Sequence, residues 1–235
     1  MIDFFKSIGD GFYQNFIEAD RWKFLADGLL ITLYVTACAA IIGVVLGFLV
    51  GLIRANASRN GKKNILTFLC DIYVTVIRGT PVMVQLLIIY YVIFASARNL
   101  DPSVSAIICF GVNSGAYVSE IFRSGILSID IGQTEAGRSL GLTSAQTMIR
   151  IVLPQAIKNA LPALGNEMIT LLKETSIVGT IGLVDLTKSY EIIQSRTLSV
   201  FWPLMAIAAI YLVIVMGLSK LLGILERRLR QSDKR

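Results

Sequence analysis

Apolar stretches long enough to cross a lipid bilayer alternate with short polar connections along this chain of 235 residues. A membrane-spanning helix needs about 20 predominantly apolar residues. Five stretches meet or approach this length, at residues 28–53, 81–97, 104–126, 156–183 and 203–225. The pattern predicts an all-α membrane protein with five transmembrane helices and a polar segment, residues 130–155, between the third and the fourth.

Glycine and proline predict details of the first two spans. Gly43, Gly47 and Gly51 recur every fourth residue and line one helix face, where a neighbouring helix can approach closely. Before the second span, the sequence Gly79-Thr80-Pro81 interrupts the helical pattern. We expect a short helix at residues 65–78, near the cytoplasmic surface, to lead into the span proper.

The remaining segments are predicted to lie at or outside the membrane surface. Residues 1–27 mix aromatic and acidic side chains and lack the order of features that defines a cleaved signal peptide, so we expect an interfacial segment. Residues 54–64 form a short basic loop, residues 185–202 a connection of mixed charge, and residues 227–235 a basic cytoplasmic tail.

The composition agrees with a membrane protein. Hydrophobic residues make up 54% of the chain, charged residues only 16%, against about 25% in soluble domains, and the mean hydropathy is +0.68. The formal net charge of +6 requires no nucleic-acid partner, because Lys and Arg at membrane edges account for it. Histidine is absent, and the three widely spaced cysteines suit neither a disulfide framework nor a metal site. We therefore expect no metal and no catalytic residue in this chain.

The distribution of Lys and Arg predicts the orientation, since cytoplasmic loops carry an excess of both. With five spans and the tail inside, thirteen cations fall in cytoplasmic segments, namely Arg54, Arg59, Lys62, Lys63, Arg123, Arg138, Arg150, Lys158, Arg227, Arg228, Arg230, Lys234 and Arg235. Six fall outside, namely Lys6, Arg21, Lys23, Arg98, Lys188 and Arg196. This bias places the N-terminus outside and the 130–155 segment and the C-terminus in the cytoplasm.

The 130–155 segment is predicted to form two short helices joined at a glycine. Glu135 is expected in the first turn of one helix, where a carboxylate suits the positive helix end. Gly141 permits the turn that closes this helix, and Thr143 has capping-box spacing to Gln146 at the start of the next. Pro154 removes a backbone donor, so we expect the second helix to end or kink there.

This segment resembles the coupling loop of ABC-importer membrane subunits, whose pattern is EAA, three residues, Gly, nine residues, Ile, one residue, Leu-Pro. The matching positions are Glu135, Ala136, Gly141, Ile151, Leu153 and Pro154, with Gly137 in place of the second Ala. The strings IRGTPVMVQLLIIYY, NSGAYVSEIFRSGI and ALPALGNEMITLLKETSIVGTIG resemble the subfamily for polar amino acids, of the histidine, glutamine or arginine type. The resemblance runs from Leu29 to Arg230.

The resemblance implies a type I importer transmembrane domain in a bacterial cytoplasmic membrane, carrying polar amino acids, among which basic ones are a candidate. It implies that the coupling loop binds a separate ATPase dimer, which holds ATP and Mg²⁺, while this chain binds no cofactor. It further implies a second permease copy or a paralogue, and an extracytoplasmic amino-acid-binding protein.

Two of the predicted spans carry polar faces. The third has Asn113, Tyr117 and Glu120 at helical spacing, and the fourth has Glu167, Thr170, Lys173 and Glu174. Polar groups in a membrane are costly, and an ionisable one is a functional candidate by default. These seven residues are the candidate substrate pathway, and the three glutamates would suit a cationic amino acid.

A competing interpretation makes these groups structural. Glu120 would then pair with Arg123 or Ser124, and Lys173 would form a charge pair near Glu174 or with Glu167.

Two other classes of protein remain open from the sequence. An ion-coupled secondary amino-acid transporter would be favoured by a chain of acids at the membrane centre and by an inverted repeat. Acids are present, but five spans do not divide into equal halves and no repeat is visible. A membrane anchor without a pathway is the other, and the polar faces of the third and fourth spans argue against it.

Overall fold

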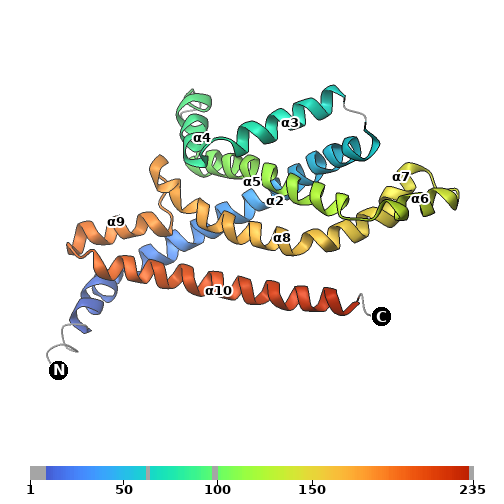
Figure 1. Cartoon of the computed structure of the whole chain (residues 1–235). Helices are drawn as coiled ribbons and strands as arrows, with labels where there is room; N and C mark the ends of the chain where they lie inside the picture. Colours follow the sequence, from blue (N-terminus) through green and yellow to red (C-terminus); the bar gives the residue numbers. More distant parts are fainter. Residues whose placement is uncertain (1–8, 62–63, 97–99, 233–235) are drawn as a thin grey trace.

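A computed structural model describes residues 9–61, 64–96 and 100–232, and the regular structure within these ranges is helical, without a strand (Figure 1). The α-helices are α2 (Trp22–Asn60), α3 (Ile65–Arg78), α4 (Val82–Ile88), α5 (Pro102–Leu127), α6 (Ile131–Ser139), α7 (Ser144–Thr147), α8 (Leu153–Glu174), α9 (Leu186–Thr197) and α10 (Phe201–Ser232). Short π- or 3-10-helical segments are η1 (Tyr13–Ile17), η2 (Glu18–Asp20), η3 (Ile89–Ile93), η4 (Met148–Val152) and η5 (Thr175–Ile181). Lys6, Lys62, Lys63, Arg98, Lys234 and Arg235, which entered the orientation count, lie outside the described residues.

The glycine face of α2 packs against α5. A Cβ atom added to Gly51 would lie 2.7 Å from the Ser119 carbonyl oxygen, and one added to Gly47 would lie 2.8 Å from the Gly115 carbonyl oxygen. Such distances are too short for any side chain, so the two backbones touch only because these positions are glycine. The predicted close approach is confirmed.

Three helices in the described part of the chain are long and apolar enough to cross a membrane, namely Trp22–Arg59, Pro102–Leu127 and Phe201–Arg228. A fourth candidate is the pair Ile65–Arg78 and Val82–Ile93, bent by 104° at the Gly-Thr-Pro break. The first member of this pair has the bounds that the pattern predicts. α8 does not reach the same apolarity, because Lys158, Glu167, Lys173 and Glu174 interrupt it. Length and composition therefore support three or four spans, and the predicted fifth stays a prediction.

One predicted boundary is wrong. The loop expected at residues 54–64 begins only after Asn60, because α2 continues for seven residues beyond Ile53 and ends at Gly61, whose φ is +64°. α10 continues beyond the predicted fifth span to Ser232, so the first residues of the basic tail expected from residue 227 extend its helix. Helices that emerge from a membrane continue wherever their next residues favour the helix, so loss of apolarity alone does not end them.

The connection expected at residues 185–202 contains a helix, α9, that the pattern did not predict. Its buried side chains Leu186 and Ile193 pack against Phe16 of the N-terminal segment and Ile207 of α10. Thr197 donates a hydrogen bond of 3.0 Å to the side-chain oxygen of Asn15. Tertiary packing, rather than apolar periodicity, holds this helix.

Asp185 starts α9 from a fully buried position. Its carboxylate oxygens accept hydrogen bonds from the backbone N–H groups of Lys188, at 2.9 Å, and Thr187, at 3.1 Å. Burial raises the pKa of the Asp185 carboxyl, and these hydrogen bonds oppose the rise. The Leu186 N–H completes the attachment by donating to Thr32 of α2 at 3.1 Å.

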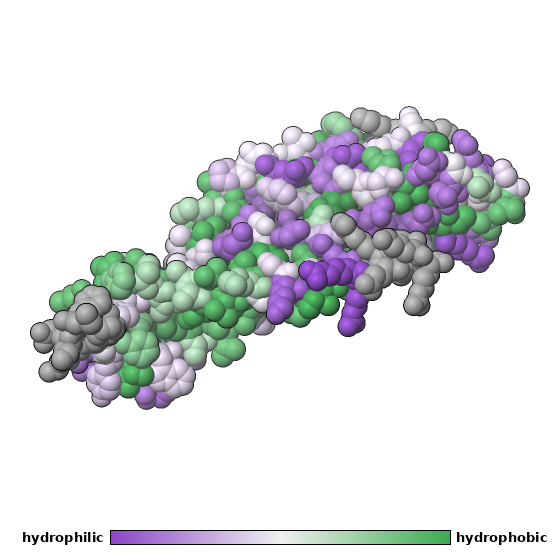
Figure 2. All heavy atoms as spheres, turned by 60° about the horizontal axis from the view of Figure 1, so that its bottom comes forward, coloured by the Kyte–Doolittle hydropathy of each residue, from purple (hydrophilic) through white to green (hydrophobic). Residues whose placement is uncertain are grey.

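The two ends of the molecule differ in character. α6 and α7 lie at one end, on the side where α10 finishes, and α9 and the N-terminal segment lie at the other (Figure 1). On the face seen in Figure 2, apolar side chains gather over the half nearer the N-terminus and polar ones over the half that carries the 130–155 segment.

The role of Asp185 is testable by thermal unfolding in detergent. We expect Asp185→Ala to lower the free energy of unfolding by about 1–2 kcal/mol, because a helix cap is lost. Asp185→Asn should retain the wild-type midpoint, since Asn caps equally well and needs no buried charge. An equal loss in both variants would contradict this role.

Candidate functional site

The first helix of the 130–155 segment, α6, is capped by Asp130. The Asp130 carboxylate accepts a hydrogen bond of 2.6 Å from the Gly132 N–H. Glu135 is the fifth residue of α6 and lies exposed in its second turn. The prediction that placed Glu135 in the first turn is wrong, because the helix begins at Ile131, directly after its cap Asp130.

The turn between α6 and α7 forms as predicted. Gly141 has a φ of +82°, the left-handed conformation that favours glycine. The Leu142 N–H donates to the Gly137 carbonyl at 3.1 Å, and the Gly141 N–H donates to the Arg138 carbonyl at 3.0 Å. This pair of hydrogen bonds is a Schellman motif, which satisfies the last carbonyls of α6.

The capping box at the start of α7 is confirmed. The Gln146 N–H donates to the Thr143 hydroxyl at 3.3 Å, and the Gln146 side chain accepts from the Thr143 N–H at 2.9 Å. The turn at Gly141 is therefore held by capping interactions on both sides, which makes the pair of helices a rigid unit.

The helical path does not end at Pro154. η4 is a π-helical turn in which the Leu153 N–H donates to the Met148 carbonyl, five residues earlier, and α8 then runs on through Pro154. A π-turn adds one residue per turn and changes the register of the hydrogen bonds just before the proline. Pro154 then occupies the first turn of α8, where a missing N–H costs little.

Gly137, the one departure from the importer pattern, lies at the contact between α6 and η4. It is buried, and a Cβ atom there would lie 2.8 Å from the Thr147 methyl carbon and 2.9 Å from the Ile151 terminal carbon. Thr147 is fully buried and β-branched, so its methyl group has little freedom to move. Glycine at this position allows the two helices of the segment to pack closely.

The outer surface of the segment is apolar at three points that the motif did not identify. Leu140 at the turn is 82% exposed, Ile149 is 64% exposed and Ile131 is 63% exposed. The sequence contains one signal for Leu140, which directly precedes the glycine of the predicted turn, where apolar residues are uncommon. Hydrophobic periodicity alone does not distinguish an exposed apolar residue from a buried one.

The three polar residues of α5 each engage a different helix. The Asn113 amide donates to the Gln85 side-chain oxygen of α4 at 3.0 Å, and Asn113 is only 3% exposed. Tyr117 lies under the guanidinium of Arg78, at the end of α3, with 5.1 Å from the guanidinium carbon to the ring centre. Glu120 belongs to an ion cluster.

This ion cluster is centred on Arg54 of α2. The Arg54 guanidinium contacts Asp71 of α3 at 2.7 Å and Glu120 at 2.5 Å, and Glu120 also contacts Arg123 at 2.9 Å. Pairing of Glu120 with Arg123, one of the two interpretations left open, is therefore present. Arg54 was missed because it was counted as a loop cation, whereas the extension of α2 brings it between α3 and α5.

One polar residue of α8, Glu167, lies within electrostatic range of the Arg78 side chain. Glu167 accepts a hydrogen bond of 3.1 Å from Ser114 of α5, and it lies within electrostatic range of Arg78 and Glu174. Thr170 and Lys173 are exposed on α8, and the charge of Lys173 acts on Glu174. The fold thus brings Tyr117 and Glu167 near Arg78, with Glu174 in electrostatic range of Glu167, while Glu120 lies apart in the ion cluster.

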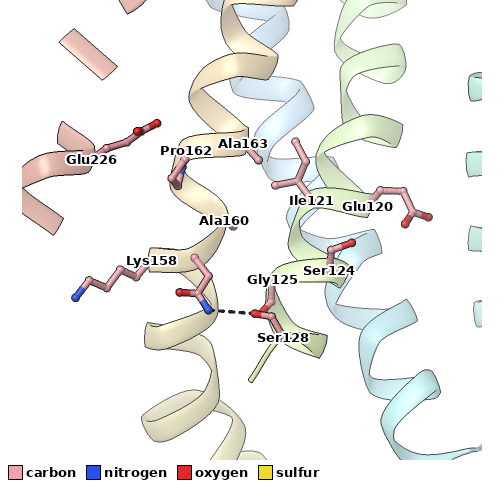
Figure 3. Close-up of a pocket in the computed structure, with 11 residues that line it drawn as sticks. Glu120, Ile121, Ser124, Gly125, Ser128, Lys158, Ala160, Pro162, Ala163 and Glu226 are labelled. Atoms are coloured by element: carbon pink, nitrogen blue, oxygen red, sulfur yellow. Dashed lines mark hydrogen bonds between the residues drawn. The ribbon is translucent and has the colours of Figure 1, made fainter. Parts of the chain in front are cut away.

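A cavity of about 700 Å³ lies between α5, α8 and the last part of α10 (Figure 3). The small residues Gly125 and Ala160 line it, and of two other lining residues the Asn159 amide donates a hydrogen bond to the Ser128 hydroxyl at 3.1 Å. Of the predicted pathway residues only Glu120 lines it, and the Glu120 carboxylate points away from α8. Among the described residues, no group of three or more Cys, Asp or Glu side chains is arranged to hold a metal ion.

Apolar helices, a polar surface shared by α5 and α8, and an exposed, rigid helical turn at one end together define a membrane transport permease. The family model described as the binding-protein-dependent transport system inner membrane component matches residues 43–231, and the chain belongs to this family. It is a permease subunit of an amino-acid ABC importer, and family membership gives no support to the ion-coupled alternative.

Individual relatives agree with this assignment. The chain is 39% identical over 207 residues to a putative glutamine transport system permease protein of Rickettsia bellii (strain RML369-C), covering 88% of this chain and 93% of that protein. It is 38% identical over 211 residues to the arginine transport system permease protein of Bacillus subtilis (strain 168), covering 89% and 94%. A crystal structure of an amino acid ABC transporter with histidines has a chain of 43% identity and a TM-score of 0.81, covering 90% of this chain and 96% of that one. The fold is thus that of a type I ABC importer transmembrane domain.

The close packing at Gly137 is testable by substitution. Gly137→Ala gains about 1 kcal/mol of helix propensity. Overpacking against the Thr147 methyl group costs about 1–3 kcal/mol, so we expect a net loss of thermal stability.

Two further variants make this test specific. Gly217→Ala in α10 should not lose stability, because its Cβ would meet nothing within 4 Å. Adding Thr147→Ser to Gly137→Ala removes the methyl group and should restore part of the loss. A Gly137→Ala protein as stable as Gly217→Ala would refute the packing argument.

Proposed function

We propose that this permease forms half of a pathway for polar amino acids, basic ones included, and is driven by a separate ATPase that binds the 130–155 segment. The chain then catalyses no reaction and holds no cofactor, because ATP and Mg²⁺ belong to the ATPase dimer. The observation that carries the proposal is the exposed apolar surface on a backbone that is capped on both sides of its turn.

The apolar surface suits insertion into a groove of a partner protein. Leu140 and Ile149 present apolar area to water, which is unfavourable until a partner covers it. Because the turn between α6 and α7 is already rigid, little conformational entropy is lost when it binds. A rigid contact also transmits a movement of the partner instead of absorbing it.

The side chains around Arg78 match the charges of an amino acid. The α-carboxylate of a substrate suits the Arg78 guanidinium, and the cationic side chain of a basic amino acid suits Glu167 or Glu174. Glu120 is neutralised by Arg54 and Arg123, so we assign it a structural role instead of substrate binding. Asn113 is buried and holds Gln85, so we assign it a supporting role.

A second permease, either a copy or a paralogue, completes the pathway. Thr170 and Lys173 are exposed on a helix that the membrane would surround, and polar side chains do not face lipid. A water-filled space between two permeases gives α8 a polar environment. In this arrangement α8 is the fifth helix that crosses the membrane, although its composition is too polar for a span that faces lipid on all sides.

The two ends of the molecule then face different compartments. The 130–155 segment and the end of α10 lie in the cytoplasm, and α9 and the N-terminal segment lie outside, where a binding protein delivers the substrate. Opposite placement of these parts in the fold (Figure 1) and the excess of Lys and Arg in the cytoplasmic segments support this orientation.

The proposal is tested by reconstitution in liposomes with the ATPase and the binding protein. Amino-acid uptake should require ATP and should not be driven by a proton gradient alone. Leu140→Ser should abolish copurification of the ATPase and uptake, because the apolar contact is lost. Leu198→Ser, at a leucine that is 90% exposed at the opposite end, is the matched control and should retain ATPase binding. Full ATPase binding by Leu140→Ser would reject this docking surface.

The role of Glu167 is tested by substrate selectivity. Glu167→Gln should lower arginine uptake about tenfold relative to glutamine uptake, because a charged hydrogen-bond partner of the cation is lost. Glu191→Gln on α9 removes the same charge from an exposed position and should leave the ratio unchanged. A parallel loss of both substrates in Glu167→Gln would assign Glu167 to the structure only.

A further inference from the structure

Arg59, in the last turn of α2, joins three helices through hydrogen bonds. Its guanidinium donates to the carbonyl oxygens of Ile126, at 2.9 Å, and Ile129, at 2.7 Å, and to the Thr134 hydroxyl at 2.9 Å. Ile126 belongs to the last turn of α5, Ile129 to the joint after it, and Thr134 to the start of α6. The side chain therefore spans the junction where α5 passes into the 130–155 segment.

The acceptors at this junction suit an arginine. The last carbonyls of a helix have no partner within the helix, and they form its negative end. A planar guanidinium can donate to several of them at once in a fixed geometry, whereas an amine offers a single point of charge. Only two residues, Ile129 and Asp130, separate the C-cap of α5 from the first residue of α6, so Arg59 reaches both helices.

An apolar layer closes the other side of the same junction. Ala55 of α2 packs with Ile126 and Ile129, and with Val152 and Ala156 on the path into α8. The junction is thus packed on one side and hydrogen-bonded on the other. If α6 moves relative to α5, the Arg59 contacts must either break or move the end of α2 with it.

The same end of α2 is tied to α3. Five residues before Arg59, Arg54 contacts Asp71 of α3 at 2.7 Å. α3 ends at Arg78, the residue that contacts the Tyr117 ring. Two arginine contacts, Arg59 with Thr134 and Arg54 with Asp71, therefore connect α6 to α2 and α2 to α3. α3 is continuous from Ile65 to Arg78, so the connection reaches the polar side chains near Arg78.

We propose that Arg59 is a positioning residue that transmits movement of the 130–155 segment to α2 and, through the Arg54–Asp71 pair, to α3. The inference rests on the proposed function, because it assumes an ATPase that moves this segment. It adds a second route to the covalent connection through α5 and α8. Without Arg59 the segment still binds the ATPase, but it rotates at the junction of α5 and α6. ATP hydrolysis then proceeds, while the helices that line the pathway do not move with the segment.

The experiment measures amino-acid uptake per ATP hydrolysed by the assembled transporter in liposomes, with labelled glutamine and arginine as probes. Arg59→Gln should retain ATPase binding and basal hydrolysis and should lower uptake per ATP about tenfold, a change within the usual range for coupled sites. Arg59→Lys should recover part of the ratio. Lys220→Gln, at an exposed cation of α10, is the matched control for loss of charge and should keep the wild-type ratio.

Thr134 separates coupling from stability. Thr134→Val removes the hydroxyl acceptor on α6 but leaves the Arg59 contacts to α5, so it should also lower uptake per ATP. Thr134→Ser keeps the hydroxyl and should behave as wild type. In the double variant Arg59→Gln with Thr134→Val, the ratio should fall no further than in Arg59→Gln alone, because the contact between Arg59 and Thr134 is already lost in Arg59→Gln.

Three results would each overturn the inference. An unchanged ratio in Arg59→Gln overturns the inference, and so does equal behaviour of Thr134→Val and Thr134→Ser. If Arg59→Gln fails to assemble, the Thr134 pair decides in the same way. A wild-type complex that takes up nothing with ATP overturns the proposed function itself, and the inference with it.

Discussion

The close contact between α2 and α5 determines where the other parts of this permease lie. Gly47 and Gly51 let the backbone of α2 touch that of α5, so the two helices act as one rigid pair. One face of α5 then meets α3 and α4 through Tyr117 and Asn113, and its end leads directly into the 130–155 segment. In a membrane, where apolar contact with a neighbour offers little advantage over contact with lipid, such close backbone packing is a main source of helix association.

Polar groups supply the remaining connections, and each is placed where a partner satisfies it. Arg54 links three helices through Asp71 and Glu120, at the end of the bundle that carries the 130–155 segment. A buried charge without such partners would be strongly destabilising, so this cluster fixes the relative positions of α2, α3 and α5 more than it adds stability. Arg59 does the same for the junction of α5 and α6, with backbone carbonyls as its partners.

The 130–155 segment combines a rigid interior with an exposed surface. Gly137 and Ile151 face one another across α6 and η4, whereas Leu140 and Ile149 face outward. Gly137 and Ile151, at positions of the importer pattern, therefore maintain the shape of the segment, whereas the exposed Leu140 and Ile149 lie outside the pattern. The π-turn before Pro154 joins this unit to α8 without a break, so α8 is a direct extension of the segment.

Local chemistry determined much of this protein from the sequence alone. The glycine spacing on α2, the turn at Gly141, the capping box at Thr143 and the bounds of α3 depend on neighbouring residues, and each was predicted correctly. The motif at residues 135–154 likewise led to the family, because its spacing is a property of the chain. Other features are decided by contacts between residues far apart in sequence. Only the folded chain brings Arg54 to Glu120 and Arg59 to Thr134, holds α9 against the N-terminal segment, and separates Glu120 from the residues near Arg78. These pairings depend on how helices pack in three dimensions, which hydrophobic periodicity does not encode.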